Sequence, residues 1–328
     1  MDYITLAKEI VSLYPFGSPD IEFIRHNENI TFKITDPLNR NCYILRIHMP
    51  VTDGFAGIQN TFEGLQSEMI VLKELYSNNV IHVQEPVKNC MGDYVTVYNS
   101  TEFDVPCLAT LLTWMEGATL SVEEDDMEAA AFALGEELAA LHEFTRSYKP
   151  VEKLSRPVYD GNRIDFAMDE LQCGVERALY SMEQYETIKE VLQLVKRQLI
   201  ELDSRKNSWG LIHADLQFGN VIIHNGRLGL IDFSLSGYSY YLFDLGSASS
   251  MLPTEWRKTF LNGYSSKSSF IMDDLRYIEG LIFMDIFISY CFFIRDDNRN
   301  GWIKTNAAEL CDTLCKDFIQ GKSVYYSL

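Results

Sequence analysis

The sequence predicts an α+β fold of two unequal lobes, with an antiparallel β-sheet in the N-terminal lobe and a larger, mainly helical C-terminal lobe. The chain has 328 residues, which exceeds the usual size of one domain. Strand-like runs dominate residues 1–113, whereas apolar residues at helical spacing dominate residues 114–328. We therefore expect the first lobe to end near residue 113.

The first lobe is expected to combine a meander of strands with two helices. An amphipathic helix at its start is terminated by Pro15 and Gly17. The expected helices are 4–14 and 61–77, and the expected strands are 21–26, 30–35, 42–48, 94–98 and 108–113. Turn-forming residues separate the first three strands, so a five-stranded antiparallel sheet is predicted.

The second lobe is expected to be built from helices. They are predicted at 127–144, 163–180, 186–202, 241–251, 255–264, 273–294 and 307–319. The most apolar stretch, 280–294, contains Asp285 and is short for a membrane span. It is therefore predicted to be a buried helix.

Residues 211–233 carry the clearest chemical pattern. Asn225-Gly226 is a strong two-residue turn signal, since both central positions of a type I′ turn have positive φ. Such a turn places Asn220 and Asp232 at the open end of one hairpin. An amide oxygen and a carboxylate suit Mg²⁺, which takes few protein oxygens and completes its shell with water and phosphate. Asp215 precedes Asn220 by five residues, in a loop after an apolar strand.

The pattern His213-x-Asp215-x-x-x-x-Asn220 followed by Ile231-Asp232-Phe233 resembles the catalytic and metal-binding loops of the aminoglycoside phosphotransferase family, relatives of the protein kinases. The resemblance implies a two-lobed, protein-kinase-like fold. It also implies that Asp215 is the base for the attacking hydroxyl, and that Asn220 and Asp232 hold the magnesium that bridges the nucleotide phosphates.

The same resemblance implies a phosphate-binding cation in the third strand and an acid on the following helix. Arg46 stands where the family usually has Lys, and Glu68 falls where the helix acid lies. Arginine binds phosphate bidentately and stays charged, so Arg46 is expected to pair with Glu68 and clamp the phosphates. Lys33 on the preceding strand is the competing cation.

The segment 111–117 resembles the interlobe hinge of the family. This likeness implies that backbone groups of roughly Thr113, Trp114 and Met115 bind adenine. The turn 27–29 would cover the nucleotide, although it has no glycine-rich loop.

Three further polar residues are expected to support the structure around these loops. His142 is expected to be a packed helical histidine, His213 to support its loop by hydrogen bonding, and Asp244 to fix that loop without touching metal.

Composition excludes several classes of function. The net charge of −19 argues against nucleic acid as a partner, because binding to phosphate backbones needs a basic footprint. Seven scattered cysteines do not form a disulfide framework, which fits a reducing cytoplasm. The first residues lack the features of a signal peptide, and no membrane association is expected.

The sequence therefore predicts a small-molecule kinase that transfers the γ-phosphoryl group of ATP, with GTP as the alternative donor, to a hydroxyl with the help of Mg²⁺. The acceptor could be an aminoglycoside, another amino-bearing alcohol or a sugar derivative. Acidic residues that could receive ammonium groups are Asp273, Asp274, Glu279, Asp285, Asp296 and Asp297. A non-catalytic nucleotide-binding protein is the alternative, and a protein kinase a more remote one, because only eleven residues separate Asp232 from Asp244. The oligomeric state stays open.

Overall fold

The structure is a computed structural model that describes residues 3–26, 29–49, 57–99, 106–124, 126–268 and 274–328. The chain divides into two compact units. The first unit comprises Met1–Thr119, Pro150–Arg156 and Ile222–Ser234, and the second comprises Leu120–Lys149, Pro157–Val221 and Leu235–Leu328. Two short segments from later in the chain therefore belong to the unit that contains the N-terminus.

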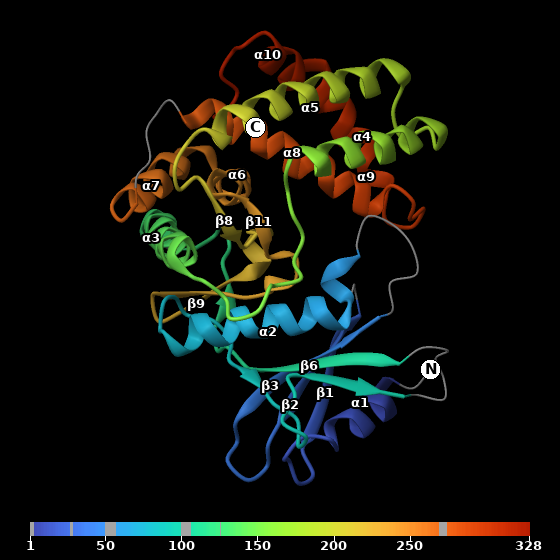
Figure 1. Cartoon of the computed structure of the whole chain (residues 1–328), viewed down its shortest axis with the longest axis vertical. Helices are drawn as coiled ribbons and strands as arrows, with labels where there is room; N and C mark the ends of the chain where they lie inside the picture. Colours follow the sequence, from blue (N-terminus) through green and yellow to red (C-terminus); the bar gives the residue numbers. More distant parts are fainter. Residues whose placement is uncertain (1–2, 27–28, 50–56, 100–105, 125, 269–273) are drawn as a thin grey trace. The chain divides into compact units, whose positions relative to one another are not determined.

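An antiparallel sheet forms the centre of the first unit (Figure 1). Its strands are β1 (Asp20–His26), β2 (Asn29–Thr35), β3 (Cys42–His48), β4 (Pro86–Val87), β5 (Val95–Tyr98) and β6 (Cys107–Thr113). The order is β1-β2-β3-β6-β4, with β5 also pairing with β6. Five of these strands were predicted, and β4 was missed because two residues are too few to show an alternating pattern.

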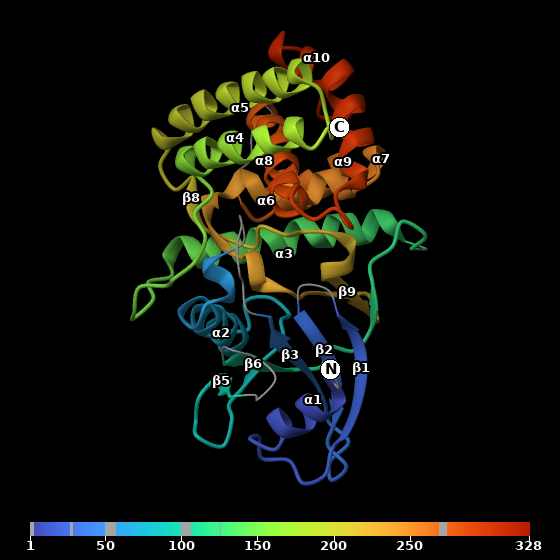
Figure 2. The same ribbon diagram turned by 90° about the vertical axis from the view of Figure 1, so that its right-hand side faces the viewer.

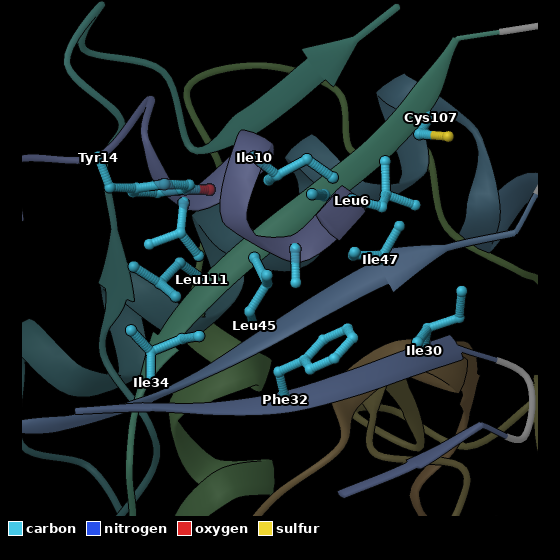
Figure 3. Packing of buried hydrophobic residues seen from close by; sticks show 13 residues of the cluster. Leu6, Ile10, Tyr14, Ile30, Phe32, Ile34, Leu45, Ile47, Cys107 and Leu111 are labelled. Atoms are coloured by element: carbon cyan, nitrogen blue, oxygen red, sulfur yellow. The ribbon is translucent and has the colours of Figure 1, made fainter. Parts of the chain in front are cut away.

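The sheet packs one face against helix α1 (Tyr3–Val11). Side chains on alternate residues of the central strands meet this helix, including Phe32 of β2 and Leu45 of β3 against Ile10 (Figure 3). Because strand residues alternate between faces, Arg46 projects to the opposite face. That face receives helix α2 (Phe62–Ser77), which Thr61 caps by accepting the Gly64 N–H at 3.1 Å.

The predicted hairpin at Asn225-Gly226 is present. It joins β9 (Val221–His224) to β10 (Arg227–Leu230), and both turn residues have positive φ, 50° and 73°. A third strand that the sequence did not reveal, β7 (Ala118–Thr119), pairs with β9. Gly117 makes this pairing possible, since its φ is +130° and an added Cβ would lie 2.4 Å from the carbonyl oxygen of Ile223.

Helices dominate the second unit. They are α3 (Met127–Ser147), α4 (Gly161–Glu176), α5 (Met182–Asp203), α6 (Tyr241–Met251), α7 (Thr254–Ser265), α8 (Leu275–Phe293), α9 (Gly301–Glu309) and α10 (Cys315–Ile319). The predicted last helix, 307–319, is in fact α9, a π-helical turn at Leu310–Leu314 and α10.

The buried helix α8 packs against α4, α5 and α6, and Figure 2 shows α4 and α5 lying side by side. The predicted buried helix is present, and its residues Phe283, Met284 and Phe287 are fully buried. No helix in the described part of the chain combines the length and apolarity that a membrane crossing requires.

A two-stranded sheet carries the loop that contains Asp215. Strand β8 (Trp209–Ile212) leads into the loop and pairs antiparallel with β11 (Gly237–Tyr240), from Ile212 opposite Gly237 to Trp209 opposite Tyr240. Helices α3 and α6 both pack against β8. The start of the loop is thereby fixed by the core of the second unit.

Candidate active site

In the first unit, Arg46 of β3 lies between two carboxylates. Its Nη2 donates to Oε1 of Glu68 at 2.7 Å, so the predicted ion pair is present. Its Nη1 is 3.6 Å from Oδ1 of Asp232, which follows β10. Arg46 is 6% exposed and Glu68 is fully buried. A buried charge of this kind is stable only when it is paired.

The pKa of Arg46 shows how strongly the two carboxylates act on it. Burial by itself would lower this pKa, but the charges of Glu68 and Asp232 and the hydrogen bond to Glu68 reverse the effect and raise it. The guanidinium is therefore a permanent cation. The competing cation, Lys33, lies 4.5 Å above the ring of Trp114.

The group formed by Arg46, Glu68 and Asp232 contains buried polar atoms that make no hydrogen bond among the described residues. Nε of Arg46, Oε2 of Glu68 and Oδ1 of Asp232 are buried and have no hydrogen-bond partner among the described residues. Buried polar atoms without partners are uncommon and often mark a place for an ion or ligand. A donor on Arg46 and an acceptor on Asp232 suit a phosphate oxygen and a metal ion, respectively.

The backbone at Asp232 is in the left-handed region, with φ +62°. Residues other than glycine seldom adopt this conformation, and it persists only where the surroundings enforce it. Such positions concentrate at functional sites. The conformation is therefore in keeping with a special role for the Asp232 carboxylate.

In the second unit, Asp244 of α6 holds the loop after β8. Its fully buried carboxylate accepts the N–H of His213 at 2.8 Å and the N–H of Ala214 at 2.7 Å. Ala214 also has a left-handed φ of +64°. The predicted role of Asp244 in fixing this loop is confirmed, and the N–H of Asp215 in turn donates to Nδ1 of His213 at 3.3 Å.

His142 of α3 contacts the carboxylate of Asp244. Its Nε2 is 3.0 Å from Oδ2 of Asp244 and its Nδ1 is 3.0 Å from the hydroxyl of Tyr264. Burial lowers the pKa of this imidazole despite the opposing effect of Asp244, so the ring is neutral. Nε2 then donates to the carboxylate and Nδ1 accepts from Tyr264. The predicted packed histidine is confirmed.

Asp215 and Asn220 are hydrogen-bonded to each other. The Asn220 amide Nδ2 donates to the backbone oxygen of Asp215 at 2.9 Å and to its Oδ2 at 2.8 Å. Gln217 also donates to the Asp215 carboxylate, at 3.3 Å. Since Nδ2 is used in this way, Oδ1 of Asn220 is the atom left to ligate a metal.

The assignment of Asn220 and Asp232 as magnesium ligands stays a prediction. Among the described residues, no three His, Cys, Asp or Glu side chains are grouped closely enough to hold a metal ion. One carboxylate and one amide oxygen, with phosphate and water completing the shell, is the ligand set that Mg²⁺ uses at nucleotide sites.

The predicted hinge is only partly free to bind a base. The Thr113 N–H donates to the carbonyl of Glu85, its carbonyl accepts from Gln84, and the Trp114 N–H donates to the carbonyl of Cys42, each at 2.9 Å. Within the described part of the chain, the N–H of Met115 has no such partner. The adenine-binding prediction therefore narrows to Met115 and the carbonyl of Trp114. The turn at 27–29 lies largely outside the described residues.

The acidic residues that could receive an ammonium group differ in whether their carboxylates already have partners within the protein. Oε1 of Glu279 accepts from Ser323 and from the N–H groups of Val324 and Tyr325, and Asp274 and Asp297 pair with Arg205 and Arg177. Asp285 of α8 is half-buried. Its pKa is raised to about 7, first by burial and then by the nearby carboxylate of Asp215.

Sequence reasoning missed Arg156, which is 3% exposed and donates to the carbonyls of Gly64, Phe233 and Ser234. An arginine in a connecting segment carries no pattern that separates a buried residue from an exposed one.

Comparison with known proteins identifies the relatives of this arrangement. A sequence model of the phosphotransferase enzyme family matches residues 20–278. Amicoumacin kinase of Bacillus subtilis (strain 168) is 24% identical over 241 residues, which are 72% of this chain and 64% of that protein. The chain thus spans less than two thirds of this curated relative.

Solved structures show the same fold over nearly the whole chain. A microcompartment-associated aminopropanol kinase superposes with a TM-score of 0.79 at 20% identity, covering 99% of this chain and 100% of the other. An amicoumacin kinase in complex with AMP-PNP, Ca²⁺ and Ami gives a TM-score of 0.75 at 19% identity, covering 99% and 95%. The predicted kinase-like fold is confirmed.

Proposed function

The chain belongs to the phosphotransferase enzyme family, and from this premise we propose that it transfers the γ-phosphoryl group of ATP to a hydroxyl of a small, amino-bearing molecule. The observation that carries the proposal is the placement of Arg46 between Glu68 and Asp232, with buried donor and acceptor atoms that lack partners. GTP is the alternative donor.

Each residue has a defined part in this proposal. Arg46, held by Glu68, binds phosphate oxygens, and backbone groups at Trp114 and Met115 bind the base. Asn220 and Asp232, which flank one hairpin in the sequence, ligate Mg²⁺. When bound, the metal would neutralise phosphate charge.

Asp215 orients the attacking hydroxyl and takes up its proton. Its carboxylate is half-buried and is held by Asn220 and Gln217, so it is set in one orientation. Phosphoryl transfer asks mainly for positioning and electrostatic stabilisation. A non-catalytic nucleotide-binding protein would have no use for such an oriented base.

An amino group on the acceptor is supported by Asp285. A carboxyl raised to a pKa of about 7 by burial and by Asp215 is easily ionised when an ammonium group approaches. The aminopropanol kinase among the solved structures similar to this chain has an amino alcohol in its name, which is in keeping with this choice.

The metal assignment is tested by calorimetric titration with ATP in Mg²⁺ and again in EDTA. Asp232 and Asn220 give affinity only through the metal, so binding should weaken markedly in EDTA. Equal affinity in both buffers would contradict the assignment.

The acceptor class is tested by following ADP release and the formation of phosphate ester with a panel of amino alcohols. Each amino alcohol is matched with its deaminated analogue. Asp285→Asn should raise the KM for an amino alcohol while leaving the KM for ATP within about threefold. If the deaminated analogues were the better substrates in the wild type, the amino-bearing acceptor would be wrong.

A further inference from the structure

The segment Pro150–Arg156 lies in the connection between α3 and α4, two helices of the second unit, but it belongs to the first unit. We call these seven residues the strap. Figure 1 shows the strap, in yellow-green, running beside α2. Its last residue, Arg156, is 3% exposed.

The strap is attached to the first two turns of α2. Nη1 of Arg156 donates to the carbonyl of Gly64 at 3.0 Å, and the N–H of Ser155 donates to the hydroxyl of Ser67 at 2.8 Å. That hydroxyl itself donates to the carbonyl of Glu63 at 2.7 Å. Glu68, which holds Arg46, is the residue next to Ser67 and is fully buried.

The other nitrogen of the same guanidinium reaches the residues that follow Asp232. Nη2 of Arg156 donates to the carbonyl of Phe233 at 2.7 Å and to the carbonyl of Ser234 at 2.6 Å. These two peptide groups come directly after the left-handed φ of Asp232. The guanidinium therefore fixes the backbone directly after Asp232, whose left-handed conformation persists only where its surroundings enforce it.

We propose that Arg156 is a positioning residue for the nucleotide and metal site, because its single planar group links the helix that carries Glu68 to the backbone that carries Asp232. In this proposal it acts through these backbone carbonyls and is not itself a ligand of the nucleotide or the metal. It sets the spacing between the Arg46–Glu68 pair and the Asp232 carboxylate. This inference rests on the proposed function, since it concerns the same site.

The chemistry calls for arginine at this position. The guanidinium carries five N–H donors in a rigid fork and can serve acceptors on two different segments at once. Lysine has a compact ammonium group on a flexible stem, so Arg156→Lys keeps the charge but loses the fixed geometry.

Arg257 of α7 offers a matched control within the same chain. It is also 3% exposed, and it donates to the backbone carbonyls of Leu252, Tyr325 and Leu328. It lies in the second unit and joins α7 to the last residues of the chain. Its loss should cost stability, as the loss of Arg156 should, without touching Glu68 or Asp232.

The experiment measures ATP affinity at increasing Mg²⁺ concentration, and once in EDTA, for the wild type, Arg156→Met and Arg257→Met. Groups that orient metal ligands typically change metal affinity by 10–100-fold. We expect Arg156→Met to raise the Mg²⁺ concentration at half-maximal ATP binding by about tenfold or more. Its affinity in EDTA should stay within about threefold of the wild type, and Arg257→Met should leave the midpoint unchanged while lowering the melting temperature.

The milder pair Arg156→Lys and Arg257→Lys serves the same comparison should a methionine variant fail to fold. If the Mg²⁺ midpoint of the Arg156 variant moved no more than that of its Arg257 counterpart, the inference would be overturned while the proposed function stood. A wild type that binds ATP equally well in Mg²⁺ and EDTA would overturn both.

Discussion

The guanidinium of Arg46 lies 2.7 Å from Glu68 and 3.6 Å from Asp232, so one planar cation faces two acids with different surroundings. The Glu68 side chain is fully buried, whereas that of Asp232 is 29% exposed. Glu68 is thus suited to hold the arginine in place, and Asp232 is accessible to an ion. Neither role needs the lysine that the family usually has at this position.

Replacement of Arg46 tests the phosphate clamp. Charge-assisted hydrogen bonds contribute roughly 1.5–3 kcal/mol, so Arg46→Ala should raise the KM for ATP by roughly 10–100-fold, and Arg46→Lys should recover part of the loss. Steady-state kinetics on the folded variants measures this, with Lys33→Ala as the comparison. The clamp would have to be reassigned if ATP kinetics changed in Lys33→Ala and not in Arg46→Ala.

The raised pKa of Asp285 predicts how the stability of the protein changes with pH. Its pKa is raised from 3.8 when unfolded to about 7 in the folded protein. The folded protein therefore binds the proton of the Asp285 carboxyl more tightly than the unfolded chain does. The stability that this proton contributes to the folded protein is fully present below about pH 4 and is lost as the pH rises through 7.

Asp285→Asn should consequently stabilise the protein at pH 8 and should have little effect near pH 4. The stabilisation at pH 8 should be only about 1–2 kcal/mol, since solvent reduces the electrostatic effect at a residue that is only half-buried. Thermal unfolding of the variant and the wild type across this range measures the difference. Asp312→Asn, which changes an acid with a 71% exposed side chain, is the control variant. A constant difference between pH 4 and pH 8 would refute the raised pKa.

At the scale of elements, the hairpin β9–β10 depends on its contact with β7. The two pairs Ala118 with Ile223 and Thr119 with Ile222 join these strands. The N–H of Leu230 in β10 donates to the carbonyl of His82 at 2.9 Å. The hairpin that leads to Asp232 is therefore held on both strands by earlier parts of the first unit.

Two glycines separate the effect of close packing from that of backbone conformation. Gly117 and Gly92 both have positive φ, +130° and +91°, but an added Cβ meets the Ile223 carbonyl at 2.4 Å only at Gly117 and nothing within 4 Å at Gly92. Both alanine variants bear the cost of a positive φ that side chains of L-residues rarely adopt.

Gly117→Ala should therefore lower the free energy of unfolding by at least about 1 kcal/mol more than Gly92→Ala, as overpacking against the backbone adds a cost of its own. Chemical denaturation measures both. Equal losses would mean that β7 moves aside without cost and does not hold the hairpin.

The long elements and the hairpin marked by Asn225-Gly226 could be predicted from the sequence, whereas three of the short strands could not. The periodicity of 61–77 and of 241–251 was enough to find α2 and α6. Strands β4 and β7 have two residues each, and β11, Gly237–Tyr240, has only four. These strands owe their conformation to pairing with distant partners, which local patterns do not reveal.

At the scale of the whole molecule, the same contrast applies to the candidate site. Asp215, Asn220 and Asp232 lie within 18 residues of sequence and form a motif. The contacts of Arg156 reach residues 77, 78 and 92 positions away. No sequence spacing could reveal a residue whose importance comes only from folding, so the motif residues were predictable and the strap was not.

The charge of the whole chain bears on its choice of acceptor. A net charge of −19 attracts cations over distances of about 10 Å at ordinary ionic strength. Amino-bearing acceptors should therefore associate faster at low salt, whereas nucleotides gain nothing from this field. The net negative charge of the chain and the carboxyl of Asp285 thus both favour an amino-bearing acceptor.

The central claim is phosphoryl transfer with Asp215 as the base, and the most direct test is Asp215→Asn. The substitution is nearly isosteric and leaves Arg46 and Asp232 untouched, so MgATP binding measured by calorimetry should stay within about threefold of the wild type. Turnover of the best amino alcohol, measured as ADP release, should fall by about 10²–10⁴-fold, while the control Asp312→Asn keeps the wild-type rate. Phosphorylation by Asp215→Asn at the wild-type rate would contradict the assignment of Asp215 as the base, and with it the account of how this site works.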